Sequence, residues 1–259
     1  MMHPILNIAT QAARQASRII LRFMEQMDKV SISEKSINDF VTQVDKLSEE
    51  AIISHIKKSY PHHAILSEEA GFIAGKDDEY TWVIDPLDGT RNFMHGYPQF
   101  SISIAIMKNN VTEFGLIYDP IRQELFTATR GQGAYVNSRR MRISDAKRMG
   151  QTLIATGFPF RKKENIKTYL TAFENVFSKC GDIRRAGSAA LDLAYVAAGR
   201  LDGYWESDLF IWDIAAGALM VKEAGGMATD FQNTETYLES GKIIAANPKI
   251  HKELIQLII

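Results

Sequence analysis

The sequence predicts a mixed α and β fold from three observations. Apolar residues near the N-terminus recur at helical spacing, residues 100–107 alternate with a period of two, and the region after Gly150 alternates short strands with helices. With 46% hydrophobic and 24% charged residues, the 259-residue chain has the composition of a globular protein with a core. Its length fits one large domain or two tightly joined halves, with a soft boundary near Gly150. Helices and strands are therefore expected to pack in mixed layers.

The N-terminal region predicts two amphipathic helices. In the first, which Pro4 opens, apolar residues lie three and four positions apart. They are Ile5, Ala9, Ala12, Ala16, Ile19, Ile20, Phe23 and Met27. The second helix follows Thr42 and stops before Pro61. Its apolar side consists of Val44, Leu47, Ala51 and Ile52. The polar segment 31–40 is too irregular to predict an element.

The middle of the chain predicts an antiparallel meander. Residues 100–107 alternate as in a strand, an asparagine pair at 109–110 indicates a turn, and residues 111–118 resume as a second strand. Two further strands are expected at 124–129 and 133–136.

The C-terminal part predicts alternating strands and helices. The strands are expected at 153–156, 203–206, 227–230 and 243–246. The helices are expected at 166–178, 189–198, 212–224 and from Pro248 onward. A glycine pair at 225–226 stops the third of these helices.

Charge and cysteine content exclude several classes of protein. The 30 basic and 31 acidic residues give a net charge of −1, so no overall field draws the chain to nucleic acid or to a membrane. Cys180, the one cysteine, forms neither an internal disulfide nor a zinc motif. The N-terminus lacks the pattern of a secretory leader, and no apolar run is long enough to span a bilayer. We expect a cytoplasmic protein without a membrane partner.

The most informative stretch is a hydrophobic strand that runs into two carboxylates. Trp82, Val83 and Ile84 precede Asp85 and Asp88, which lie three positions apart around a proline, with a glycine directly after them. Two close carboxylates are stable as anions only near cations, and hard oxygen ligands select magnesium, calcium or manganese. The same residue types also favour a simple turn, so this stretch alone leaves metal site and turn equally favoured.

Two neighbouring patterns favour the metal site. Glu68 and Glu69 follow a short apolar strand, and Asp213 lies at a helix start, where the helix dipole stabilises a negative charge. Three acidic positions of this kind indicate a polynuclear metal site. The sequence does not show that they meet.

The residues around these carboxylates resemble the inositol monophosphatase family, above all its bacterial SuhB-type members. Residues 85–93 read Asp-Pro-Leu-Asp-Gly-Thr-Arg-Asn-Phe, and residues 212–217 read Trp-Asp-Ile-Ala-Ala-Gly. Glu-Ala-Gly-Gly at 223–226, Gly-Ser-Ala-Ala at 187–190 and the Glu68-Glu69 pair match as well. The resemblance covers essentially the whole chain. It implies a single domain over residues 1–259 with an α+β fold, the layered αβαβα sandwich that inositol monophosphatases share with fructose-1,6-bisphosphatases.

The resemblance further implies a magnesium-dependent, lithium-sensitive inositol-phosphate phosphatase with two to three Mg²⁺ ions in each active site. Glu68, Asp85 and the carbonyl of Leu87 would hold one ion. Asp85, Asp88 and Asp213 would hold a second, and a third, weaker ion would lie near Glu68.

Catalytic and substrate roles follow from the same resemblance. Thr90 with Glu68 would orient the attacking water, and Asp45 would support that water or the metal. The substrate would be bound by Gly89, Thr90, Gly187, Ser188, Ala189, Glu206 and Asp213, with Glu206 hydrogen-bonding a ring hydroxyl.

Arg91 departs from the family pattern, which commonly has a threonine at this position. A guanidinium here would contact phosphate, alter the substrate range or point outward. The expected substrate is a small phosphorylated polyol, first of all myo-inositol 1-phosphate, with fructose-1,6-bisphosphate and a nucleotide 3′-phosphate as alternatives.

A second class of function is binding. SuhB-type proteins are associated with ribosomal RNA transcription complexes, so RNA polymerase or antitermination factors are alternative partners. Three basic clusters are candidates for RNA contacts, although the absence of interleaved aromatics or an RNA module favours solvated surfaces. They are Arg139, Arg140, Arg142, Lys147 and Arg148, then Arg161-Lys162-Lys163, and Arg184-Arg185. The resemblance also implies a homodimer, with Arg184 at its interface.

Overall fold

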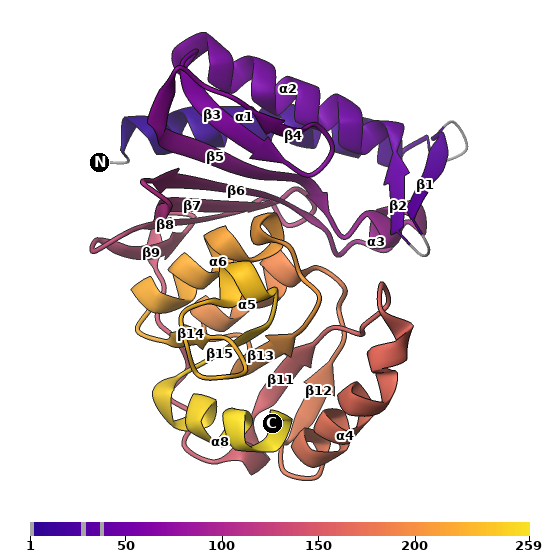
Figure 1. Cartoon of the computed structure of the whole chain (residues 1–259), viewed down its shortest axis with the longest axis vertical. Coiled ribbons are helices and arrows are strands. Elements are labelled where there is room, and N and C mark those ends of the chain that lie inside the picture. Colours follow the sequence, from indigo (N-terminus) through magenta and orange to yellow (C-terminus); the bar gives the residue numbers. More distant parts are fainter. Residues whose placement is uncertain (1–2, 27–29, 37–38) are drawn as a thin grey trace.

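Helices and sheets alternate in five layers in the computed structural model, which describes residues 3–26, 30–36 and 39–259 (Figure 1). Two helices cover the outer face of a large sheet, two lie between the large sheet and a smaller one, and two cover the far face of the smaller sheet. From top to bottom of Figure 1 these are α1 (Pro4–Met24) and α2 (Gln43–Ser59), α5 (Ala189–Ala197) and α6 (Ile211–Glu223), and α4 (Ile166–Phe177) and α8 (Pro248–Ile258). The expected αβαβα sandwich is confirmed.

The large sheet has eight strands among the described residues, in the order β10-β9-β8-β7-β6-β5-β3-β4. The strands are β3 (His63–Ser67), β4 (Gly71–Ile73), β5 (Asp77–Asp88), β6 (Ser101–Lys108), β7 (Val111–Asp119), β8 (Glu124–Thr129), β9 (Gly133–Val136) and β10 (Arg139–Arg140). Strands β3 and β5 are parallel, whereas β5 to β10 pair antiparallel in chain order. The predicted meander is therefore confirmed, with Asn109 and Asn110 at positive φ in its first turn.

The smaller sheet has five strands among the described residues, in the order β12-β11-β13-β15-β14. They are β11 (Leu153–Thr156), β12 (Asp182–Arg184), β13 (Gly203–Glu206), β14 (Met227–Thr229) and β15 (Ile243–Ala246). The chain passes from the large sheet to the smaller one between Arg140 and Leu153. The short elements are β1 (Ile32–Ser36), β2 (Asp39–Thr42), α3 (Thr90–Met94), α7 (Tyr237–Ser240) and 3-10 turns at Met149–Gln151 and Lys163–Asn165.

Two predicted helices differ in detail from the observed ones. Helix α1 ends at Met24, and the predicted end at Met27 lies outside the described residues. Helix α2 spans the predicted range, but Leu47 on its predicted apolar side is 40% exposed. The buried side of α2 instead includes polar residues, because this helix packs beside the site described below. Segment 31–40, whose pattern predicts no element, contains most of an antiparallel strand pair, β1 and β2.

Strand β6 is buried on both faces, although its period of two is typical of a strand with one exposed face. Ile102, Ile104 and Ile106 pack in the cluster of α1 and α2, and Ala105 and Met107 pack in the cluster of α5 and α6. The middle helix layer therefore lies directly on the sheet, and side chains of β6 that include the small Ser103 and Ala105 face it. None of the helices within the described ranges is long and apolar enough to cross a membrane.

The close packing of α5 on α6 predicts the effect of filling a glycine. A Cβ at Gly217 would lie 2.5 Å from the Cβ of Leu193. We expect Gly217→Ala to lower the free energy of unfolding by roughly 1–3 kcal/mol in urea denaturation, because overpacking outweighs the helix propensity of alanine. Gly150→Ala is the matched control, since its Cβ would meet only Lys179 O at 3.7 Å. Equal stability of the two variants would contradict this packing.

Candidate metal and phosphate site

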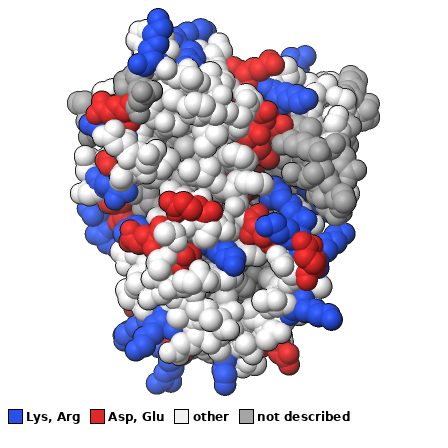
Figure 2. All heavy atoms as spheres, viewed as in Figure 1, with Lys and Arg blue, Asp and Glu red and all other residues white. Residues whose placement is uncertain are grey.

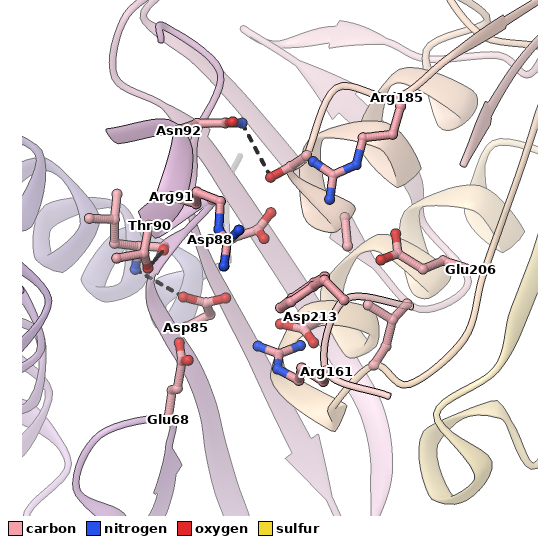
Figure 3. Close-up of a pocket in the computed structure, with 16 residues that line it drawn as sticks. Glu68, Asp85, Asp88, Thr90, Arg91, Asn92, Arg161, Arg185, Glu206 and Asp213 are labelled. Carbon is pink, nitrogen blue, oxygen red and sulfur yellow. Dashed lines mark hydrogen bonds between the residues drawn. The ribbon is translucent and has the colours of Figure 1, made fainter. Parts of the chain in front are cut away.

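A cavity of about 120 Å³ opens where β5 ends, against the N-terminal ends of α5 and α6 (Figure 3). Its walls come from the loop after β3, the end of β5, α3, the loops after β11 and β12, and the segment around β13 and α6. The lining residues are Glu68, Asp85, Leu87, Asp88, Gly89, Thr90, Arg91, Asn92, Phe160, Arg161, Arg185, Gly187, Ala189, Glu206, Leu209 and Asp213.

Asp85 and Asp88 reach the same cavity because the strand ladder is irregular between them. Asp85 pairs with Ser103 of β6 and Asp88 with Ser101, so two residues of β5 lie opposite one residue of β6. In a regular strand, residues three positions apart would point to opposite faces. The backbone amide of Leu87 donates to Asp85 Oδ1 at 2.9 Å, which fixes the first carboxylate within this bulge.

Asp213 comes to the same point from the first turn of α6. Its Oδ2 accepts a hydrogen bond from the backbone amide of Phe210 at 2.8 Å, which caps the helix. Ser103 Oγ donates to Trp212 O at 3.0 Å and ties this helix start to β6. Carboxylate oxygens of Asp85, Asp88 and Asp213, one from each residue, all lie within 4.8 Å of one another. The structure thus brings Asp213 to the two carboxylates at the end of β5, a meeting that the sequence did not show.

Burial and mutual repulsion disfavour the charged forms of these carboxylates. Burial raises the pKa of Asp85 well above its usual range, and Glu68, Asp88 and Asp213 add repulsion. Burial likewise raises the pKa of Asp213, with Asp88 as the main charged neighbour. Burial raises the pKa of Asp88 to about 6. A buried all-oxygen cluster of this kind fits a hard divalent cation, which would restore the ionised forms.

Thr90 links the cavity to α2. Its Oγ1 lies 2.8 Å from Asp45 Oδ1 and 3.0 Å from the carbonyl oxygen of Leu87. Asp45 does not line the cavity; its Oδ2 accepts from both the backbone amide (2.8 Å) and the hydroxyl (2.6 Å) of Thr42. Glu68 lines the same side of the cavity at the end of β3. Thr90 and Glu68 therefore share a wall, with Asp45 behind it.

The 187–190 segment supports Asp88 from the opposite side. The hydroxyl of Ser188 and the backbone amide of Ala190 both donate to Asp88 Oδ2. Gly187 and Ala189 line the cavity, whereas Ser188 lies behind them and the Ala190 amide is already bound to the carboxylate. Gly89 adopts φ 93°, and a Cβ there would lie 3.0 Å from Gln99 O.

Glu206 forms the wall opposite Glu68 (Figure 3). It accepts a hydrogen bond from the hydroxyl of Tyr204, and burial raises its pKa to about 7 while Arg185 acts to lower it. A Cβ at Gly157 would lie 1.9 Å from its carboxyl carbon. Only glycine at 157 thus leaves room for this side chain.

Arg161 and Arg185 both line the cavity, although each belongs to a basic cluster that was expected to face solvent. Arg161 is half-buried, which corrects that expectation, whereas Arg185 is exposed as expected and lines the cavity as well. Arg161 stacks on Phe160 and Phe210 at 4.6 and 4.9 Å, and Arg185 stacks on Phe158 at 5.3 Å. The sequence signal that could have indicated this placement is the pair of aromatic residues at 158 and 160, directly before Arg161. Arg91 also lines the cavity, with its guanidinium 5.7 Å from the Phe160 ring.

Asn92 lines the cavity as well, although the sequence gave it no separate role. Its side-chain nitrogen donates to Gln99 O at 2.6 Å and to Ala186 O at 2.9 Å, so it joins α3 to the segment before β6 and to the loop that carries Gly187. The Glu-Ala-Gly-Gly motif at 223–226 lies outside the cavity. Glu223 accepts from the backbone amides of Gly131 and Gly133 at 2.7 Å each and holds the β8–β9 turn. On the face in Figure 2, positive and negative side chains are interspersed.

The raised pKa values predict how the metal-free protein responds to pH. Asp88 and Glu206 hold protons more tightly in the folded chain than in the unfolded chain, where carboxyls titrate near pH 4. The stability provided by their protonated forms is present at low pH and lost as pH rises through about 6 and about 7. We expect the melting temperature in EDTA, measured by calorimetry, to fall between about pH 5 and about pH 7.

Asp88→Asn is the control for this pH dependence. The amide does not titrate, so the fall in melting temperature between pH 5 and 7 should be smaller in the variant. An unchanged slope would contradict the assignment to Asp88.

Comparison with known proteins agrees with this geometry. A protein called Nus factor SuhB from Escherichia coli K12 is 52% identical over 98% of this chain and 95% of its own length. The crystal structure of extragenic suppressor protein suhB from Bartonella henselae has a TM-score of 0.97 and 43% identity, covering 99% of this chain and 98% of that one. An inositol monophosphatase from Anabaena has a TM-score of 0.87 and 38% identity, covering 98% and 94%. The inositol monophosphatase family model matches residues 1–258, and the chain belongs to this family.

Proposed function

We propose that this protein, acting as a single domain, is a magnesium-dependent phosphomonoesterase that hydrolyses a small phosphorylated polyol, first of all myo-inositol 1-phosphate. The observation that carries the proposal is the convergence of the Asp85, Asp88 and Asp213 carboxylates within 4.8 Å in an open cavity. Membership of the inositol monophosphatase family supports the reaction class. Fructose-1,6-bisphosphate and nucleotide 3′-phosphates remain alternative substrates.

In this proposal, Glu68, Asp85 and the Leu87 carbonyl hold one Mg²⁺ ion. Asp85, Asp88 and Asp213 hold a second, and a third binds near Glu68. When bound, the ions supply an acidified water and neutralise charge on the phosphoryl oxygens and the leaving alkoxide. Lithium inhibition is expected with these sites.

The protein's own residues position the reactants. Thr90 and Glu68 orient the attacking water, and Asp45 fixes the Thr90 hydroxyl through their 2.8 Å contact. The backbone amides of Gly89 and Thr90 contact the phosphate oxygens.

Substrate specificity comes from the opposite wall. Glu206 accepts a hydrogen bond from a ring hydroxyl, beside Asp213 and the segment formed by Gly187, Ser188 and Ala189. Arg91 and Arg161, which both contact the Phe160 ring, lie where they can add contacts to a phosphate.

We also propose a homodimer. Helix α4 exposes an apolar stripe at helical spacing, in which Ile166, Leu170 and Phe177 are 40%, 52% and 58% exposed. Beside it, β12 is an edge strand of the smaller sheet. A second copy of the chain would bury both features.

Asp88→Asn tests the phosphatase proposal. The amide keeps the shape of the side chain but removes a metal-binding charge, so phosphate release from myo-inositol 1-phosphate should fall more than about 100-fold with little loss of fold. EDTA should abolish release by the wild-type protein. Asp145→Asn, at an exposed position away from the cavity, is the matched control and should retain activity.

Two outcomes would contradict this proposal. Activity of Asp88→Asn close to that of the wild type would rule out the metal assignment. If purified wild-type protein binds magnesium but hydrolyses none of a panel of inositol, fructose and nucleotide phosphates, the phosphatase function itself is wrong.

A second function is favoured by the relatives at about 50% identity that are called Nus factor SuhB. We propose binding to the transcription antitermination machinery, including RNA polymerase, through a surface separate from the cavity. Asp88→Asn should then bind RNA polymerase and antitermination complexes as tightly as the wild type in a gel-shift titration. Loss of binding in this folded variant would show that the cavity is required.

A further inference from the structure

Glu49 is a buried carboxylate on α2 that contacts the segment carrying Glu68. It is 4% exposed, whereas its neighbour Glu50 is exposed. Glu49 Oε1 accepts a hydrogen bond from the hydroxyl of Ser67 and another from the backbone amide of Glu69 at 2.9 Å. These two donors come directly before and directly after Glu68 in the chain. We propose that Glu49 is a positioning residue that fixes Glu68 for metal binding, which rests on the proposed metal site.

The position of Glu68 in the fold explains why it needs support. Strand β3 pairs with β5 as far as Ser67, opposite Ile84, and with β4 through Ser67 and Gly71. Glu68 therefore lies at the tip of the β3–β4 hairpin, where the amide of Glu68 still reaches Ile84 O at 3.2 Å. Glu49 joins this tip to a helix in another layer. A metal ligand has to be held within about 0.5 Å of its productive position, so this tether restricts a ligand at a hairpin tip.

The spacing of Asp45 and Glu49 places both on one face of α2. Residues four apart on a helix lie one above the other. Asp45 contacts the hydroxyl of Thr90, and Glu49 contacts the residues that flank Glu68. One helix face therefore supports both members of the pair that is proposed to orient the water. This arrangement also explains why polar residues occupy the buried side of α2 while Leu47 faces solvent.

The chemistry of Glu49 favours positioning over simple packing. Burial of a carboxylate is costly, and an apolar side chain of the same length would fill the space at lower cost. What the carboxylate adds is one oxygen that accepts two hydrogen bonds with defined directions. The side-chain oxygen of glutamine can accept the same two bonds, whereas methionine fills a similar volume without them.

The test compares Glu49→Met with Glu49→Gln. In calorimetric titrations of Mg²⁺ into metal-free protein, we expect Kd to rise about 10- to 100-fold in Glu49→Met and no more than about threefold in Glu49→Gln. With saturating Mg²⁺, the KM for myo-inositol 1-phosphate should stay within about twofold of the wild type, because Glu49 is remote from the substrate wall. Glu50→Met, on the exposed side of the same helix, should bind Mg²⁺ as the wild type does.

Melting temperatures in EDTA separate positioning from packing. A Glu49→Met variant that melts earlier but binds Mg²⁺ with wild-type affinity would overturn the proposal. Equal loss of affinity in Glu49→Gln and Glu49→Met would also overturn it, because the charge and not the hydrogen bonds would then matter. If Glu49→Met does not fold, Ser67→Ala removes one of the two bonds, and unchanged Mg²⁺ affinity in that variant would contradict the role.

These binding measurements do not depend on turnover. Wild-type protein that binds Mg²⁺ without hydrolysing any phosphate ester, while Glu49→Met binds it weakly, would leave the positioning role standing and contradict the proposed phosphatase. Wild-type protein that binds no Mg²⁺ would overturn both.

Discussion

The concentration of buried negative charge at the end of β5 is the constraint on which the rest of the structure depends. Three carboxylates lie within 4.8 Å of one another, and burial opposes the ionisation of each. The surrounding groups offset part of this cost: a helix start at Asp213, the Leu87 amide at Asp85, and the Ser188 hydroxyl with the Ala190 amide at Asp88. A divalent cation would offset the remainder.

The layered fold supplies these groups from distant parts of the chain. Asp88 and Ser188 are 100 positions apart, yet they meet because α5 lies in the layer directly beneath the large sheet. Glycines permit this close approach: a Cβ at Gly115 of β7 would lie 2.9 Å from Ala216 O of α6. On the other side of the sheet, α2 supports Thr90 and the Glu68 segment. The cavity thus takes its walls from the large sheet, the middle helix layer and the smaller sheet with its loops, with support from the outer layer.

Local sequence patterns predicted most elements, because each depends on short-range periodicity and capping. Strands β8, β9, β11, β13 and β15 have the predicted ends, and α5 and α6 agree within a residue or two. The elements without a local signal were those stabilised by pairing or burial elsewhere, such as β12, which adds three residues to β11, and the β1–β2 pair. The alternating pattern of β6 did not reveal its second buried face, because serine and alanine are equally compatible with solvent and with a tightly packed helix.

The sequence by itself determined the carboxylates of the site, because Asp85, Asp88 and Asp213 stand in local motifs whose turn and helix-start chemistry is readable from neighbouring residues. Tertiary structure alone decided that Asp213 meets the other two, that Arg161 and Arg185 line the cavity, and that Glu49 supports the Glu68 segment. The physical reason is that the sequence around a charged residue looks the same whether its side chain faces water or a buried partner. Only the packing of layers places the partner within hydrogen-bond distance.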